Sequence, residues 1–104
     1  MEPILVYITV ADRAEADKIA AALVNEKLAA CANICDGVNS LFHWQGRIDS
    51  AQETLCVLKS VRGKFAALNK RVLELHSYDT PCVVALPIID GNPDFMAWIA
   101  ESCA

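Results

Sequence analysis

The residues of this chain best suited to chemistry are a histidine and a cysteine six positions apart, His76 and Cys82. Imidazole and thiolate are ligands that suit copper(I), copper(II) or zinc, and a tight turn between the two residues would let them share one ion. The alternative is that His76 ends a helix and is hydrogen-bonded there, where the helix dipole favours a cation. No CxxC or HxH spacing accompanies the pair, so chelation by His76 and Cys82 is a hypothesis that rests on two side chains.

The remaining thiols are weaker candidates. Cys31 is a possible third metal ligand, although its alanine neighbours are typical of a small buried hydrophobic position. Five cysteines cannot all pair within one chain, and the N-terminus resembles neither a secretory signal nor a transit peptide. We therefore expect reduced thiols and a cytoplasmic protein.

Four other side chains could line a polar cleft, with Glu53, Lys59 and Tyr78 as its polar groups and Trp98 as its apolar wall. The alternative is a salt bridge between subunits together with a capped loop. The glycines are isolated, so no phosphate-binding loop is present. A cysteine nucleophile with a histidine base would be the available catalytic pair, but no motif for it is recognisable. We predict that the protein is not an enzyme.

The element that must position these residues is a β-hairpin over residues 38–61. Its Phe, Trp, Thr, Val and Ile residues favour a pleated surface, and Gly46 gives the freedom that a tight reversal needs. In the return arm, odd positions from 53 to 59 point one way and even positions from 54 to 60 the other. Both sets are partly apolar, which predicts one neighbour within the chain and one in another chain.

Periodicity predicts the other elements. Asp12 with Glu15 indicates a variant capping box at the start of a helix that runs from residue 13 to residue 26 or 27. Asn92 and Pro93 indicate the start of a short terminal helix. The other expected segments are a strand over residues 4–10, a strand from residues 28–34 that continues past a bulge or turn at 36–37, a helix over residues 62–76, and a strand over residues 82–89 that is central or bordered by Pro87. The order predicts an α+β, ferredoxin-like βαββαβ sandwich with a long hairpin and a short C-terminal helix.

Composition points to self-association. Hydrophobic residues make up 55% of the 104 residues, more than the roughly 45–50% of a typical domain with glycine counted. A small domain hides only about 60–65% of its unfolded surface, so we expect one domain whose excess apolar surface lies in a subunit interface. The net charge of -4 argues against a nucleic-acid partner, and the apolar runs are shorter than the ~20 residues of a membrane span.

Four segments resemble the CutA divalent-cation tolerance proteins, in the right order and at the right spacing. They are residues 26–33 (EKLAACAN), residues 40–46 (SLFHWQG) with Glu53 and Lys59 behind them, residues 76–81 (HSYDTP) and residues 94–98 (DFMAW). The chain departs from the family pattern at Ser77 and Cys82, where the family commonly has Pro and Glu. It also has Thr9 where some bacterial members carry a cysteine linked to copper.

The resemblance implies a single CutA-like domain over residues 1–104, with a ferredoxin-like fold and a tight homotrimer similar to the PII signalling proteins. It implies a role in tolerance to copper or other divalent cations, which the protein would bind weakly. It also places residues such as Glu53, Lys59 and Tyr78 near intersubunit clefts, so a PII-like small-ligand sensor and a stable trimeric scaffold are the alternatives. Phe42 and Trp44 are the expected interface anchors.

Overall fold

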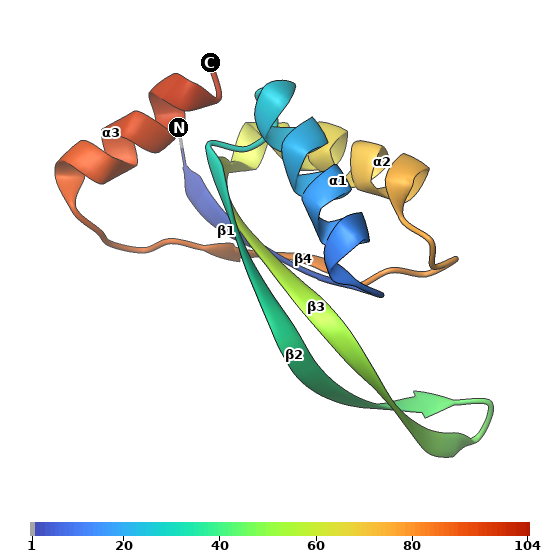
Figure 1. Cartoon of the computed structure of the whole chain (residues 1–104). Helices are drawn as coiled ribbons and strands as arrows, with labels where there is room; N and C mark the ends of the chain where they lie inside the picture. Colours follow the sequence, from blue (N-terminus) through green and yellow to red (C-terminus); the bar gives the residue numbers. More distant parts are fainter. Residues whose placement is uncertain (1) are drawn as a thin grey trace.

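A four-stranded antiparallel sheet carries two helices on one face and projects a long hairpin beyond them (Figure 1). The computed structural model describes residues 2–104. The strands are β1 (Pro3–Val10), β2 (Cys31–Trp44), β3 (Arg47–Val61) and β4 (Val83–Pro87), in the spatial order β2-β3-β1-β4. The helices are α1 (Arg13–Asn25), α2 (Phe65–Leu75), which follows a short 3₁₀ turn (Arg62–Lys64), and α3 (Pro93–Ser102). This confirms the predicted α+β, ferredoxin-like sandwich.

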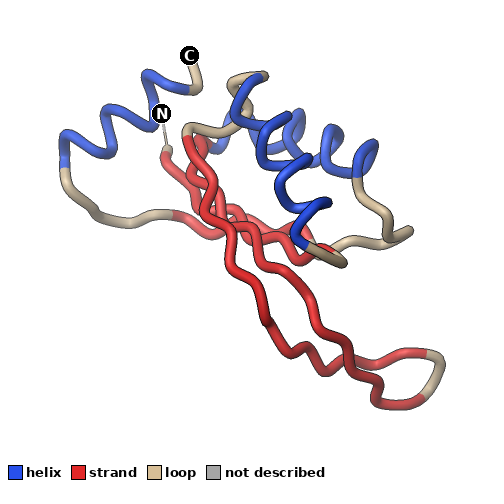
Figure 2. The backbone as a smooth tube through the Cα atoms, viewed as in Figure 1, coloured by secondary structure: helices blue, strands red, loops and turns tan. Residues whose placement is uncertain are grey.

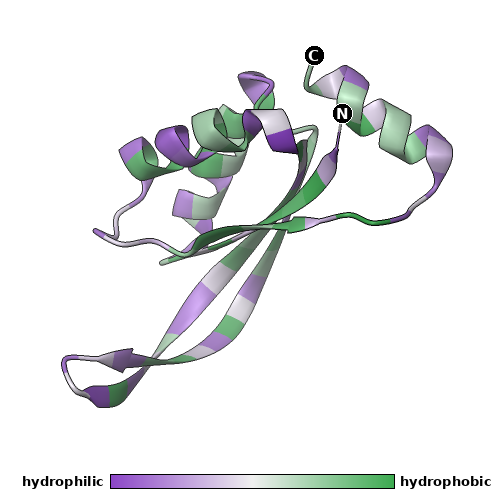
Figure 3. Cartoon of the chain, turned by 180° about the vertical axis from the view of Figure 1, so that it is seen from behind, coloured by the Kyte–Doolittle hydropathy of each residue, from purple (hydrophilic) through white to green (hydrophobic). Residues whose placement is uncertain are grey.

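The main core lies between the sheet and helices α1 and α2. Strand β1 alternates strictly, so that Ile4, Val6, Ile8 and Val10 are buried beneath the helices. The return arm of the hairpin alternates as predicted, and its buried set faces the same way; this set is Thr54, Cys56, Leu58 and Ser60. In Figure 3 the hydrophobic colour runs along the sheet strands, whereas the projecting hairpin is banded with polar and apolar residues.

The opposite face of the sheet is only partly covered. The residues between the buried ones point to this open face, and many of them are apolar and half-buried or exposed: Leu5, Tyr7, Leu55, Val57, Val84 and Leu86. Helix α3 follows the last strand on a separate arm, well away from α1 and α2 (Figure 1). A second, smaller core links α3 to the sheet through Ile99 and Cys103.

The hairpin owes its shape to two glycines. Gln45 and Gly46 form a two-residue turn with φ of 50° and 78°, the left-handed pattern that matches the twist of the flanking strands. The pairing of β2 with β3 shifts between Cys35 and Val38, where Gly37 has φ of 76°. The predicted bulge at residues 36–37 is therefore confirmed, and beyond it the hairpin projects past the rest of the sheet (Figure 2).

The helix boundaries largely follow the predicted caps. The Asp12 carboxylate accepts a 2.9 Å hydrogen bond from the Glu15 amide and begins α1. Asn92 likewise accepts bonds from two amides of the first turn of α3, with Pro93 as its first residue. The capping box is not completed, because the Glu15 side chain contacts the loop after α2 instead.

The bounds of α2 and of the last strand differ from the prediction. Helix α2 ends at Leu75 and is preceded by the 3₁₀ turn, so that His76 is its C-terminal cap. The last strand is shorter than residues 82–89 and lies at the sheet edge, where Pro87 costs no internal ladder bond.

No helix within residues 2–104 has the length and apolar character to cross a membrane.

Candidate functional site

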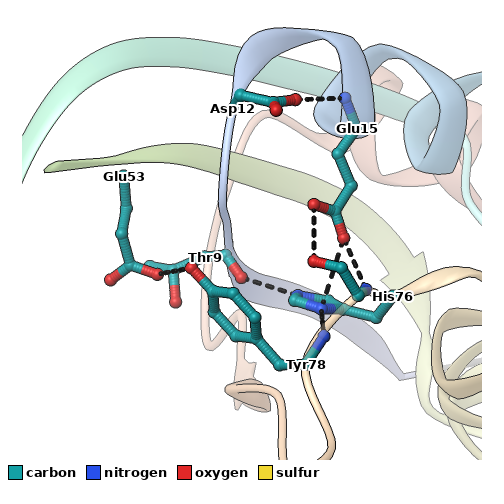
Figure 4. A network of polar contacts seen from close by, with 7 residues as sticks. Thr9, Asp12, Glu15, Glu53, His76 and Tyr78 are labelled. Atoms are coloured by element: carbon teal, nitrogen blue, oxygen red, sulfur yellow. Dashed lines mark hydrogen bonds and ion pairs between the residues drawn. The ribbon is translucent and has the colours of Figure 1, made fainter. Parts of the chain in front are cut away.

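His76 joins the end of α2 to strand β1. Its ring Nε2 donates a 2.8 Å hydrogen bond to the Thr9 carbonyl, and its Nδ1 accepts a 3.1 Å bond from the Tyr78 amide (Figure 4). These two bonds fix the neutral ring as the Nε2–H tautomer. The side chain is fully buried, so both ring nitrogens are already used within the chain.

Glu15 fastens the same loop to α1. Its two carboxylate oxygens accept bonds from the Ser77 amide (2.7 Å) and the Ser77 hydroxyl (2.9 Å). The first of these oxygens also lies 3.4 Å from His76 Nδ1. Hydrogen bonds to a charged carboxylate are stronger than bonds between neutral groups. Glu15 therefore holds the start of the loop against the first turn of α1.

Tyr78 extends the network to the hairpin. Its hydroxyl donates a 2.8 Å hydrogen bond to Glu53 Oε2 on β3, and its ring lies 4.7 Å from the His76 ring, centroid to centroid. The pKa of Tyr78 is raised to about 12. Burial is the largest cause, and the hydrogen bond to Glu53 and the nearby negative charges add to it. The phenol therefore stays protonated and remains a hydrogen-bond donor across the physiological range.

A hollow of about 730 Å³ lies between this loop and the projecting hairpin. Three aromatic side chains, three carboxylates and the Cys82 thiol are among the residues that line it, and none of its lining residues is Lys or Arg. The full lining is Thr9, Ser40, Phe42, His43, Trp44, Asp49, Ala51, Glu53, Tyr78, Asp79, Thr80 and Cys82.

The structure separates the predicted metal ligands. Cys82 is exposed in the hollow, whereas His76 is buried with both nitrogens bonded. Cys31 lies opposite Lys59 in the pairing of β2 with β3. Thr9, which the His76 ring contacts, lies opposite Leu55, four residues from Lys59 along β3, so Cys31 is away from His76. Within residues 2–104, no three His, Cys, Asp or Glu side chains come together in a group that could hold a metal ion.

The predicted cleft residues are also divided. Glu53 and Tyr78 are hydrogen-bonded to each other, but Lys59 lies six residues further along β3 and donates a hydrogen bond to the Asn33 side chain. Trp98 is on α3, 42% exposed, against the Phe95 ring. Within one chain, the four residues therefore do not form one cleft.

The two predicted interface anchors lie at the surface of the projecting hairpin. Phe42 and Trp44 are exposed, and their neighbours Leu41 and Ile48 are exposed as well. Phe42 and Trp44 also form part of the wall of the hollow. Their role between subunits stays a prediction.

Sequence reasoning missed Glu15, Thr9 and the two aspartates of the hollow as site residues. The contacts of Glu15 and Thr9 with the loop span more than 60 positions of sequence, so no local spacing indicates them. Glu15 was visible only as a capping residue. Asp49 would emerge only from the sheet register that places it opposite Phe42, and Asp79 only from the path of the loop after α2 beside the hairpin.

A small α+β sandwich with one open sheet face and a projecting hairpin defines the structural class. The family model of the CutA1 divalent ion tolerance protein matches residues 4–102. The "Divalent-cation tolerance protein CutA" of Thermus thermophilus is 44% identical over 98 residues, which cover 94% of this chain and 95% of the relative. The chain therefore belongs to the CutA1 family.

Solved structures of CutA proteins have the same fold as this chain. CutA1 from Oryza sativa has a TM-score of 0.97 and 36% identity, with all of this chain and 95% of the rice chain covered. The "Periplasmic divalent cation tolerance protein CutA" from Archaeoglobus fulgidus has a TM-score of 0.95 and 40% identity, with 98% and 99% covered. The predicted resemblance is confirmed along nearly the whole chain.

Proposed function

We propose that this chain is a non-enzymatic, homotrimeric protein of divalent-cation tolerance that binds copper or another divalent ion weakly. The observation that carries the proposal is family membership over almost the full length, among relatives whose names describe cation tolerance and no enzymatic activity. The metal, the subunit number and the weakness of binding are the parts of the proposal that need experiments.

Exposed apolar surface supports self-association. The open sheet face and the projecting hairpin both present hydrophobic side chains to solvent, and Ile89 after β4 is 94% exposed. Contiguous surfaces of this kind mark interaction sites in soluble proteins. A second copy of the chain, with the same open face, offers a surface of matching character.

The side chains near Cys82 support the proposal that metal binding is weak. Cys82 presents an accessible thiol, and thiolates favour copper(I) and zinc. His76 would have to break its bond to Thr9 or to Tyr78 before a ring nitrogen could reach an ion. The residues near Cys82 therefore do not form a resident metal centre, which favours a transient or intersubunit contact.

The direct test of the metal proposal is titration of the reduced protein with copper(I) and zinc against a chromophoric chelator. Cys82→Ser and His76→Ala are compared with Cys35→Ser, which removes an exposed thiol from β2. We expect Cys82→Ser to lose binding and Cys35→Ser to keep it. Unchanged affinity in both Cys82→Ser and His76→Ala would remove this pair as the site.

The subunit number is tested by one measurement of mass in solution, repeated with and without copper. A trimer in both conditions is the expected result. A monomer that persists at micromolar concentration would contradict the proposal, because the open sheet face would then be stable in water.

The hollow beside Tyr78 favours a second candidate, a PII-like sensor of small ligands with indirect effects of metals. A ligand screen by thermal shift, with Tyr78→Phe and Lys59→Ala beside the unchanged chain, separates the two functions. A ligand that stabilises the chain but not Tyr78→Phe would favour the sensor. A stable trimer that responds to no ligand or metal would favour a scaffold.

We also propose that the protein is cytoplasmic. All five cysteines are free, as expected in a reducing compartment. The Archaeoglobus fulgidus relative is described as periplasmic, so the compartment is a separate question for this chain. Cell fractionation of the untagged protein decides between the two.

A further inference from the structure

Glu53 is a buried carboxylate without a counter-charge. It is only 9% exposed, and it takes part in no ion pair among the described residues. Its one hydrogen bond comes from the neutral hydroxyl of Tyr78, to Oε2. Within residues 2–104, no protein donor reaches Oε1, which points away from the phenol in Figure 4. No buried side-chain oxygen among these residues lacks a partner, so Oε1 is the part of the Glu53 carboxylate that is open to the hollow. A carboxylate that is mostly buried is normally paired with a cation, and here only the hollow could supply one.

Glu53 lines the hollow, and the other lining residues that are charged at pH 7, with His43 counted as neutral, are also carboxylates. Asp49 and Asp79 are exposed carboxylates in the same lining, which contains no Lys or Arg. Lys59, the cation that would suit an anionic ligand, points to the same face but lies at the other end of β3. The hollow therefore offers negative charge to a ligand and no fixed positive charge.

The walls of the hollow suit an organic ligand more than a bare ion. Phe42, Trp44 and Tyr78 contribute aromatic surface, and aromatic faces attract cations through the ring quadrupole. The volume of about 730 Å³ falls in the range of roughly 300–1,000 Å³ that is common for small-molecule sites. No cluster of metal ligands competes for this role among residues 2–104.

We propose that the hollow binds a small organic cation, a protonated or quaternary amine that carries an apolar group. Its ammonium lies beside Glu53, with Asp49 and Asp79 nearby, and its apolar group packs against Phe42 and Trp44. This site goes beyond cation tolerance and does not depend on metal binding. It also predicts a cation where the sensor alternative allows an anion or a neutral metabolite.

Phe42 and Trp44 are also the expected interface anchors, so a second copy of the chain is the competing occupant of the hollow. The test must therefore use the full chain in its own oligomeric state. The probe is benzyltrimethylammonium, with benzyl alcohol as the neutral control and phenylacetate as the anionic control. Binding is measured by calorimetry at low ionic strength, because salt weakens a charge-based interaction.

The matched variants exchange a carboxylate for an amide of the same shape. Glu53→Gln changes the hollow, whereas Glu101→Gln makes the same change on exposed α3 outside it. Asp79→Asn alters an exposed position, so it keeps the test valid if Glu53→Gln fails to fold. Thermal unfolding of each variant checks its stability.

We expect saturable binding of the ammonium probe, about tenfold or more tighter than either control, in both the unchanged chain and Glu101→Gln. Glu53→Gln should weaken it about tenfold and Asp79→Asn about threefold. Equal binding of benzyl alcohol, or equal binding by Glu53→Gln, would overturn the proposal. An absence of saturable binding would also overturn it.

Discussion

The hydroxyl of Tyr78 donates a 2.8 Å hydrogen bond to the Glu53 carboxylate and so ties the loop after α2 to strand β3. Through the Tyr78 amide and the His76 ring, the same bond continues to the Thr9 carbonyl on β1. One chain of hydrogen bonds therefore links β1, β3 and the loop after α2. Both ends of this chain, Thr9 and Glu53, line the hollow of the candidate site.

Tyr78 should ionise only at strongly alkaline pH. Burial is the largest cause of its raised pKa of about 12, and Glu53 adds a hydrogen bond and a negative charge. The unfolded chain releases the phenolic proton near its ordinary value of 10.0. The resulting contribution to stability is complete below pH 10 and is lost as the pH rises towards 12.

An ultraviolet titration of tyrosinate checks this prediction. The step that disappears in Tyr78→Phe belongs to Tyr78. In Glu53→Gln the pKa of Tyr78 should fall but stay above 10, because the burial remains when the charge is gone. A titration curve that Glu53→Gln leaves unchanged would show that the hydrogen bond does not form in solution.

Tyr78→Phe should also lower the free energy of unfolding, by about 1–2 kcal/mol. The variant keeps the ring against His76 but leaves the buried Glu53 carboxylate without its donor. The measurement is urea unfolding at a fixed chain concentration, because oligomer formation makes stability depend on concentration. Tyr7→Phe is the control, since no residue between 2 and 104 bonds its hydroxyl, and an equal loss in Tyr7→Phe would count against the prediction.

The sequence predicts the fold better than the site, and particular residues show why. The hairpin, the bulge and both helix caps depend on nearby residues, such as Gly46 in the turn and Asn92 before Pro93. Periodicity gives the order of the elements, and the family segments agree with it. The polar network depends instead on contacts across 62 and 67 positions, from Glu15 to Ser77 and from Thr9 to His76. Such contacts need the sheet register, which periodicity does not supply.

The metal-ligand hypothesis shows the same limit. The six-residue spacing of His76 and Cys82 indicates two potential metal ligands on either side of one loop. Spacing does not show that the imidazole turns inward to Thr9 while the thiol stays exposed. Burial, which decides whether a donor is free, is a property of the packed chain.

Ser77→Ala should loosen the loop that carries Tyr78. The change removes the 2.9 Å bond from the Ser77 hydroxyl to Glu15 and keeps the 2.7 Å bond from its amide. A loss of about 1 kcal/mol is expected, below the full value of a charged bond because Ser77 is exposed. Hydrogen exchange at the Tyr78 amide should become faster as the loop opens more often. Ser102→Ala on α3 is the control, and equal exchange in both variants would contradict the proposed fastening.

Gly46→Ala should destabilise the tip of the hairpin for a purely conformational reason. Gly46 has φ of 78°, and an added Cβ there would meet no atom within 4 Å. The cost is therefore that of holding an L-residue in the left-handed region, about 1–2 kcal/mol. The measurement is chemical unfolding at fixed chain concentration.

Gly63→Ala is the matched control, because its surroundings are equally open and its φ is not positive. It should therefore change stability by less than about 0.5 kcal/mol. Equal losses in the two variants would mean that the turn is not left-handed in solution, and that the register from Trp44 and Arg47 onward is set by something other than this turn.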